Sequence, residues 1–77
     1  MEIKVLGPGC AKCNKTADLI KKVVEAEGVT ADIEKVTDMM TIAGYGVFGT
    51  PAVVIDGVVK ISGKVPKEKD IKAWLGR

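Results

Sequence analysis

A long amphipathic segment near the start of the chain constrains the fold most. Residues 11–27 are typical of a helix, and Gly28 follows where a C-terminal glycine cap belongs. The apolar positions of this segment recur at helical spacing: Ala17, Ile20, Val23 and Val24. An apolar segment at residues 3–6 and an alternation of apolar and charged residues over 31–36 flank the helix, and both patterns are typical of strands. A strand, a helix and a second strand in this order predict a right-handed crossover between parallel strands.

The rest of the chain adds a second helix, a hairpin and a final helix. We expect a short helix over residues 38–43, capped by Thr37 or Asp38, strands over 52–55 and 58–61, and a last helix with Pro66 in its first turn. Asp56-Gly57, between two β-branched segments, is a strong hairpin signal. The order βαβαββα predicts an α/β fold of one domain, 1–77, with a four-stranded mixed sheet flanked by helices. Its first and third strands are expected in the centre and its second and fourth at the edges.

Length and composition exclude several classes of function. A chain of 77 residues without histidine excludes histidine-based catalysis and histidine-containing metal sites. No apolar segment approaches the ~20 residues needed to span a bilayer, so we expect no membrane contact. A net charge of +2 and three aromatic residues offer no platform for nucleic acid. The chain opens directly on the first strand, without an export signal, so we expect a cytoplasmic protein.

The two cysteines, Cys10 and Cys13, lie where the first strand gives way to the helix. A disulfide closing so small a loop is worth only about 2 kcal/mol in the chain-entropy model, so a structural role explains the pair poorly. Free backbone N–H groups at the helix start and the charge of Lys12 both stabilise a thiolate at Cys10. Cys13 lies one turn further, on the apolar face of the helix. An exposed attacking thiolate beside a sheltered resolving thiol is what thiol–disulfide exchange requires.

With these residues in view, the sequence resembles the thioredoxin/glutaredoxin superfamily. Two motifs carry the resemblance: Gly9-Cys10-Ala11-Lys12-Cys13, and Phe48-Gly49-Thr50-Pro51 before a strand that ends in Asp56-Gly57. In length and local sequence the chain is most similar to small archaeal and bacterial thioredoxin-like "redox-active disulfide" proteins. The resemblance implies a minimal thioredoxin fold over nearly the whole chain.

The resemblance also implies roles for individual residues. Cys10 is then the attacking cysteine and Cys13 the resolving one, and they form a reversible disulfide, with Gly9 and Lys12 supporting the site. Pro51 corresponds to a cis-proline that faces the disulfide, and the backbone of Thr50 corresponds to the group that binds an extended substrate. The expected partners are disulfide-containing client proteins and a thioredoxin-reductase-type flavoprotein as electron donor. We expect a monomer with no cofactor and no metal of its own.

The chain departs from the family pattern at three places. Thioredoxins carry Trp before the first cysteine and Gly-Pro between the two, where this chain has Gly9 and Ala11-Lys12. Their buried acid six positions before the first cysteine is replaced by Lys4. Lys4 either favours a thiolate or extends to the sheet edge, and the sequence leaves both readings open. Residues 62–66 carry no acidic residue of the kind glutaredoxins use for glutathione, which favours protein disulfides as substrates.

Other uses of the same residues remain open. A Cys-x-x-Cys pair suits Cu(I), so a soft-metal binding or transfer module is the alternative function, as is a dimer bridged by a metal or cluster. A redox sensor or adaptor without turnover has the same sequence features. Residues 44–49 match Gly-x-Gly-x-x-Gly but lead into a strand, which argues against a nucleotide site. Tyr45, Val47 and Phe48 are candidate contacts for a partner, while packing of Phe48 in the core is at least as good an account.

Overall fold

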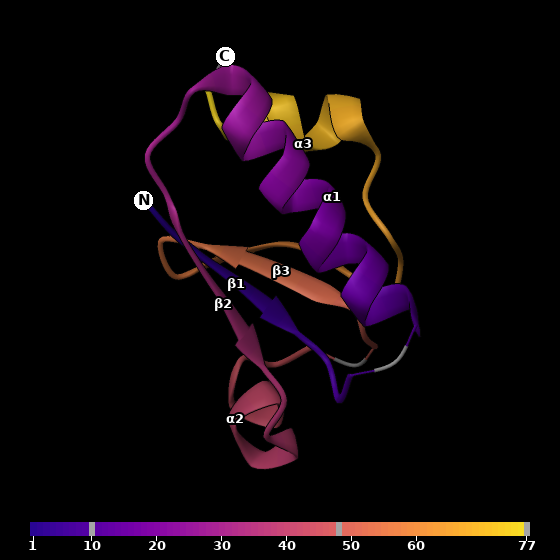
Figure 1. Ribbon diagram of the computed structural model, residues 1–77. Helices are drawn as coiled ribbons and strands as arrows, with labels where there is room; N and C mark the ends of the chain where they lie inside the picture. The colour runs from indigo at the N-terminus through magenta and orange to yellow at the C-terminus, as the bar shows by residue number, and fades with distance from the viewer. Residues whose placement is uncertain (10, 48, 77) are drawn as a thin grey trace.

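The elements of the structure follow the predicted order. The computed structural model describes residues 1–9, 11–47 and 49–76, so the predictions on Cys10 and Phe48 lie outside the described residues. Its elements are β1 (Glu2–Leu6), α1 (Ala11–Glu27), β2 (Asp32–Val36), α2 (Met39–Gly44), β3 (Ala52–Ile55), β4 (Val58–Ser62) and α3 (Glu68–Trp74) (Figure 1). Within the described ranges, none of the helices has the length and apolar character needed to cross a membrane.

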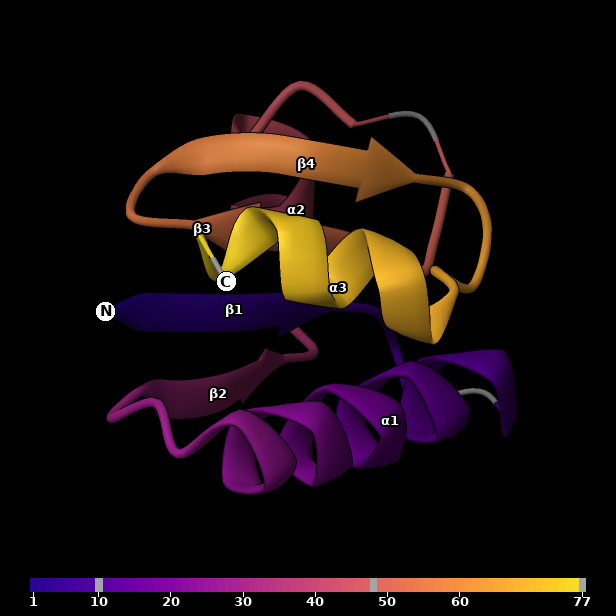
Figure 2. The ribbon, with the colours of Figure 1, turned by 90° about the horizontal axis from the view of Figure 1, so that it is seen from above.

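The four strands form one mixed sheet in the order β2-β1-β3-β4, as Figure 2 shows. β1 runs parallel to β2 and antiparallel to β3, and β3 forms an antiparallel hairpin with β4. Every residue of β3 is buried, whereas β2 and β4 are largely exposed, as befits central and edge strands. The predicted α/β fold and the places of the four strands are confirmed.

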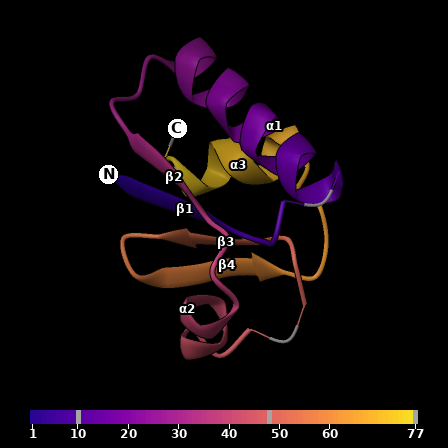
Figure 3. The same ribbon diagram turned by 60° about the horizontal axis from the view of Figure 1, so that its bottom comes forward.

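Helices cover both faces of the sheet, and the alternation of β1 divides the core between them. α1 and α3 lie on one face and α2 on the other (Figures 1 and 3). Ile3 and Val5 pack in the core under α1 and α3, while Leu6 packs with Ile42 of α2. Successive strand residues point to opposite faces, so Lys4 shares the α2 face with Leu6. The arrangement is the minimal thioredoxin fold.

Three local sequence signals are confirmed by backbone geometry. Asp38 caps α2, because its carboxylate accepts a hydrogen bond of 3.0 Å from the amide of Thr41. Gly28 follows α1 with φ +64°, as a glycine cap does. Asp56 and Gly57 have φ values of +48° and +84°, which allow the tight turn between β3 and β4.

The start of the last helix differs from the prediction. α3 begins at Glu68, so Pro66 precedes the helix instead of occupying its first turn. Lys67 is the N-cap residue, with extended backbone angles of φ −90° and ψ 157°. Its amide donates a hydrogen bond of 3.1 Å to the carboxylate of Asp70, which closes the helix start one residue after the proline. Trp74 of α3 is partly buried against the core under α1 and α3.

Candidate functional site

Three segments that the sequence singled out meet where β1 ends. Cys13, in the first turn of α1, is buried, with 4% of its surface exposed. Gly7 follows β1, and its amide donates a hydrogen bond of 2.9 Å to the carbonyl of Val36. A β-carbon built at Gly7 would overlap Cys13 Sγ, would lie 2.9 Å from Cys13 Cβ and would lie 3.8 Å from Thr50 Cβ. The sulfur of Cys13 therefore lies against the backbone of Gly7, close to Thr50.

The start of α1 is held by polar contacts around Gly9. Gly9 has φ +91°, a conformation that favours glycine, and it is exposed. The Asn14 side-chain amide donates a hydrogen bond of 3.5 Å to the Gly9 carbonyl, and Lys35 Nζ donates one of 3.3 Å to Asn14 Oδ1. These contacts connect β2, the turn after β1 and the helix start. The positive φ of Gly9 explains why a glycine, and not another residue, occupies the position before Cys10 in the sequence.

The first turn of α1 provides the environment that the sequence predicted for a thiolate. The helix begins at Ala11, so its free N–H groups lie at this end. Lys12 is exposed, and its carbonyl accepts a hydrogen bond of 2.8 Å from the hydroxyl of buried Thr16. Amide donors and a lysine at one helix end stabilise negative charge. The position of Cys10 at this end stays a prediction.

The Thr50-Pro51 peptide bond is cis, as the resemblance implied. Pro51 is buried and begins the entry into β3, and its carbonyl accepts a hydrogen bond of 2.9 Å from the amide of Gly63. Thr50 is half-buried. The chain after β4 is thus hydrogen-bonded to the segment that leads into β3, at the end of the sheet where Cys13 contacts Gly7.

A close backbone contact supports the same segment. A β-carbon at Gly49 would lie 2.9 Å from the Cα atom of Gly63 and 3.5 Å from its nitrogen. Gly63 itself has φ +81°, which disfavours any other residue there. Two glycines far apart in the sequence therefore let the segment that carries Thr50 pack directly on the chain after β4.

Replacing Gly49 with alanine should move this segment. The new methyl group meets backbone, which cannot turn aside as a flexible side chain does. We expect a loss of stability of about 1–3 kcal/mol and, with it, a fall in the melting temperature of roughly 4–20 °C. Thermal unfolding of Gly49→Ala beside Gly44→Ala measures the effect, because a β-carbon at Gly44 has no neighbour within 4 Å. Equal melting temperatures for the two variants would contradict the close contact.

A small hollow adjoins Thr50. It has a volume of about 160 Å³, and residues of α2 and of the following segment line it: Met39, Ile42, Ala43, Val47, Gly49 and Thr50. Met39 is 59% exposed at this hollow although it is a large apolar side chain. Val47, a predicted partner contact, lies here beside Thr50. An extended segment bound along Thr50 would pass this apolar surface.

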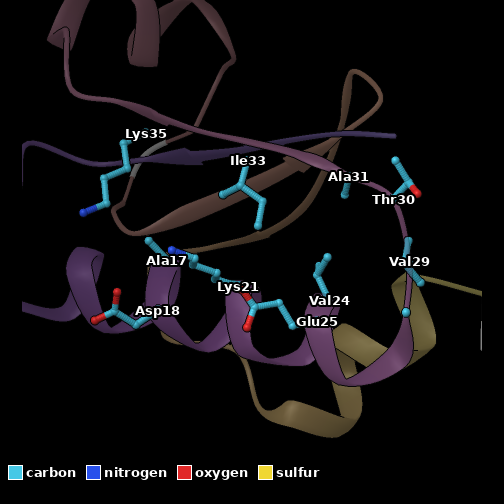
Figure 4. A pocket seen from close by; sticks show the side chains of 11 residues that line it. Ala17, Asp18, Lys21, Val24, Glu25, Val29, Thr30, Ala31, Ile33 and Lys35 are labelled. Carbon is cyan, nitrogen blue, oxygen red and sulfur yellow. The ribbon is translucent and has the colours of Figure 1, made fainter.

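A second hollow, larger than the one beside Thr50, lies elsewhere. It has a volume of about 730 Å³ and lies between α1 and β2, where Ala17 and Val24 face Ile33 (Figure 4). Asp18, Lys21, Glu25 and Lys35 surround it with both signs of charge. Among the described residues, none of those predicted for the site lines it. Its size therefore says nothing about the chemistry of the cysteines.

The side chain of Lys4 lies on the face of the sheet opposite Cys13. Its Nζ atom donates a hydrogen bond of 3.2 Å to the hydroxyl of Tyr45 on the α2 face of the sheet. That hydrogen bond, with smaller contributions from Glu34 and Glu2, holds the pKa of Lys4 above its ordinary value. Cys13 belongs to α1, which covers the opposite face. The geometry therefore offers no support for the expectation that Lys4 favours a thiolate.

Sequence reasoning missed the structural roles of four residues near the site. The sequence does not indicate that Gly7 contacts Cys13 or that Gly49 packs on Gly63. Tyr45 was read as a partner contact, whereas its hydroxyl accepts the hydrogen bond from Lys4. The contacts of Gly49 with Gly63 and of Lys4 with Tyr45 join residues far apart in the chain, so no pattern within one segment could have found them.

Comparison with known proteins gives the family of the chain. The model of the thioredoxin domain family Thioredoxin_3 matches residues 1–76. A thioredoxin of Methanocaldococcus jannaschii is 47% identical over 73 residues, which are 95% of this chain and 84% of that protein. A thioredoxin of Methanothermobacter thermautotrophicus is 33% identical over 75 residues, 97% of each chain. With the fold, the cis-proline and the Cys-x-x-Cys motif in place, the chain belongs to the thioredoxin family.

Proposed function

We propose that the protein is a thiol–disulfide oxidoreductase that reduces protein disulfides through a reversible Cys10–Cys13 disulfide. The observation that carries the proposal is the sulfur of Cys13, buried at the start of α1 against Gly7 and close to Thr50. A sheltered sulfur at this place suits a resolving cysteine, and the helix start suits an attacking thiolate three positions earlier. Membership of the thioredoxin family, whose members are typically thiol–disulfide oxidoreductases, supports the same reaction.

The proposed reaction has two steps. The Cys10 thiolate attacks one sulfur of the client disulfide, the client S–S bond breaks, and the other client sulfur leaves as a thiolate that takes up a proton. Cys13 then loses its proton and attacks the Cys10 sulfur of the mixed disulfide, which releases the second client thiol. The client gains two electrons and two protons, and the protein is left with the Cys10–Cys13 disulfide. A flavoprotein of the thioredoxin-reductase type is the proposed source of the electrons that restore the dithiol.

Thr50 and Pro51 are proposed to bind the client. Thr50 is half-buried between Gly7 and the apolar hollow, so an extended client segment paired with its backbone would lie close to Cys13. Gly9 and Lys12 are proposed to support the thiolate, Gly9 through the turn and Lys12 through its charge. We propose a reducing, cytoplasmic setting for this chemistry, because Cys-x-x-Cys pairs there are kept available for exchange.

An anaerobic redox titration tests the proposal. Free thiols are counted by alkylation and intact mass at each potential, and gel filtration follows the oligomeric state. We expect a single two-electron couple between about −200 and −300 mV and a monomer throughout. Thiols that resist oxidation until a chelator removes a metal, or a dimer that chelation dissociates, would replace this proposal with the metal-binding alternative.

A further inference from the structure

The contact between Lys4 and Tyr45 joins the centre of the sheet to the end of α2. Lys4 lies in β1, between β2 and β3, so its backbone is fixed on both sides. Its Nζ atom is 3.2 Å from the Tyr45 hydroxyl and 6.0 Å from the ring centre, which places the amine nearer the polar edge of the ring than its face. The two residues are 41 positions apart and both are partly buried. This long-range contact holds the C-terminal end of α2 against β1.

The contact pairs the charged amine of Lys4 with a neutral hydrogen-bond acceptor, the hydroxyl of Tyr45. The neighbours of Lys4 on this face of the sheet include the buried apolar residues Leu6 and Val54 and the acidic residues Glu2 and Glu34, of which Glu34 is its register partner in β2. An ammonium group in such surroundings needs an acceptor, and the phenol oxygen provides one. Because the amine is held in its charged form, the hydrogen bond persists throughout the neutral pH range.

Tyr45 leads into the segment that carries Thr50 and Pro51. It is the C-cap residue of α2, and its amide donates a hydrogen bond of 3.1 Å to the carbonyl of Ile42, while the amide of Gly46 donates one of 3.0 Å to the carbonyl of Ala43. Pro51 follows six residues later. Ile42 and Ala43 also line the hollow that Thr50 lines. A displacement of the end of α2 would therefore change the surface beside Thr50.

We propose that Lys4 and Tyr45 are positioning residues for the proposed disulfide exchange. By holding the end of α2 on β1, they place Thr50 and the hollow beside it for an extended client segment. They act on client binding and not on the sulfurs, because their contact lies on the face of the sheet opposite α1 and Cys13. This inference depends on the proposed function, since it assigns Thr50 to the client-binding surface.

Single-turnover reduction of two probes separates binding from sulfur chemistry. Pre-reduced protein is mixed with an excess of either a synthetic peptide cyclised by one disulfide or the small aromatic disulfide dithiobis(nitrobenzoate). Tyr45→Phe removes only the hydroxyl, and Lys4→Met removes only the amine. We expect each variant to raise the half-saturating concentration of the peptide about three- to tenfold, the scale of one lost hydrogen bond. The maximal rate with the peptide and the rate with the aromatic disulfide should stay within twofold of wild type.

Three further variants complete the experiment. The double variant Lys4→Met/Tyr45→Phe should be no worse than either single variant, because both remove the same contact. Lys4→Arg keeps a donor and should restore most of the peptide affinity. Lys60→Met removes the charge of an exposed lysine of β4 and should behave as wild type. Amide resonances of Gly49 and Thr50 in a nitrogen–proton correlation spectrum should shift in Tyr45→Phe but not in Lys60→Met.

The outcomes distinguish this inference from the proposed function. A wild-type protein that reduces neither probe would overturn the proposed function. An active wild type whose Tyr45→Phe and Lys4→Met variants match it in peptide affinity, with unmoved Gly49 and Thr50 resonances, would overturn the positioning role alone. Equal losses with both probes would also overturn it, because they would indicate a general effect on the fold or on the sulfurs.

Discussion

Cys10→Ser should lose disulfide reduction, whereas Cys13→Ser should trap its client as a mixed disulfide. A serine hydroxyl at position 10 cannot replace a thiolate as nucleophile, so the rate should fall at least about a thousandfold. With serine at position 13, the first attack still occurs but nothing resolves the intermediate. Mass spectrometry of the protein mixed with a disulfide-bonded client should then show one covalent complex that dithiothreitol releases.

The asymmetry between the two variants is the informative part. The buried position of Cys13 against Gly7 leaves it poorly placed to meet a client directly. Ala11→Ser introduces a hydroxyl at an exposed position between the two cysteines and should retain activity, which makes it the matched control. A covalent complex formed by Cys10→Ser instead of Cys13→Ser would reverse the proposed roles. No complex with either variant would favour the metal-binding alternative.

The fold was predictable because its signals are local. The spacing of the first helix, the Asp56-Gly57 turn and the cap at Asp38 each follow from residues within a few positions of one another. The start of α3 was misplaced for the same reason. Pro66 is compatible with a first helical turn, but the hydrogen bond from the Lys67 amide to Asp70 decides where the helix begins. Only the observed backbone shows that the helix begins after Lys67 and not at Pro66.

The site was predictable only where a motif carries its chemistry. The resemblance carried by Cys-x-x-Cys and Thr50-Pro51 implied that these two segments lie together, and the structure places Cys13 close to Thr50, while the catalytic roles stay predictions. The contacts of Gly7 with Cys13 and of Gly49 with Gly63 depend on how close two backbones approach, which composition does not encode. Lys4 shows the limit most clearly. Its position six residues before Cys10 left open whether it favours a thiolate, but the alternation of β1 directs it to the face opposite Cys13.

Gly7→Ala is the substitution of a non-cysteine residue with the largest expected effect. The backbone of Gly7 is not in the left-handed region, so alanine suits its conformation and only the space is lacking. The added methyl group would overlap Cys13 Sγ and lie 2.9 Å from Cys13 Cβ. We expect a loss of stability of about 2–3 kcal/mol, the upper range for overpacking a buried site, and a melting temperature lower by roughly 10–20 °C.

Gly44→Ala separates this steric effect from the general effect of replacing glycine. It makes the same change at the end of α2, where a β-carbon meets nothing within 4 Å and the backbone is also outside the left-handed region. Alanine there should be neutral or slightly stabilising, because it favours the helix. If Gly7→Ala has the same melting temperature as Gly44→Ala, then Gly7 does not hold the Cys13 sulfur in place. If Gly7→Ala alone is destabilised and its redox couple moves as well, then the backbone at the end of β1 sets both the packing and the chemistry of the resolving cysteine.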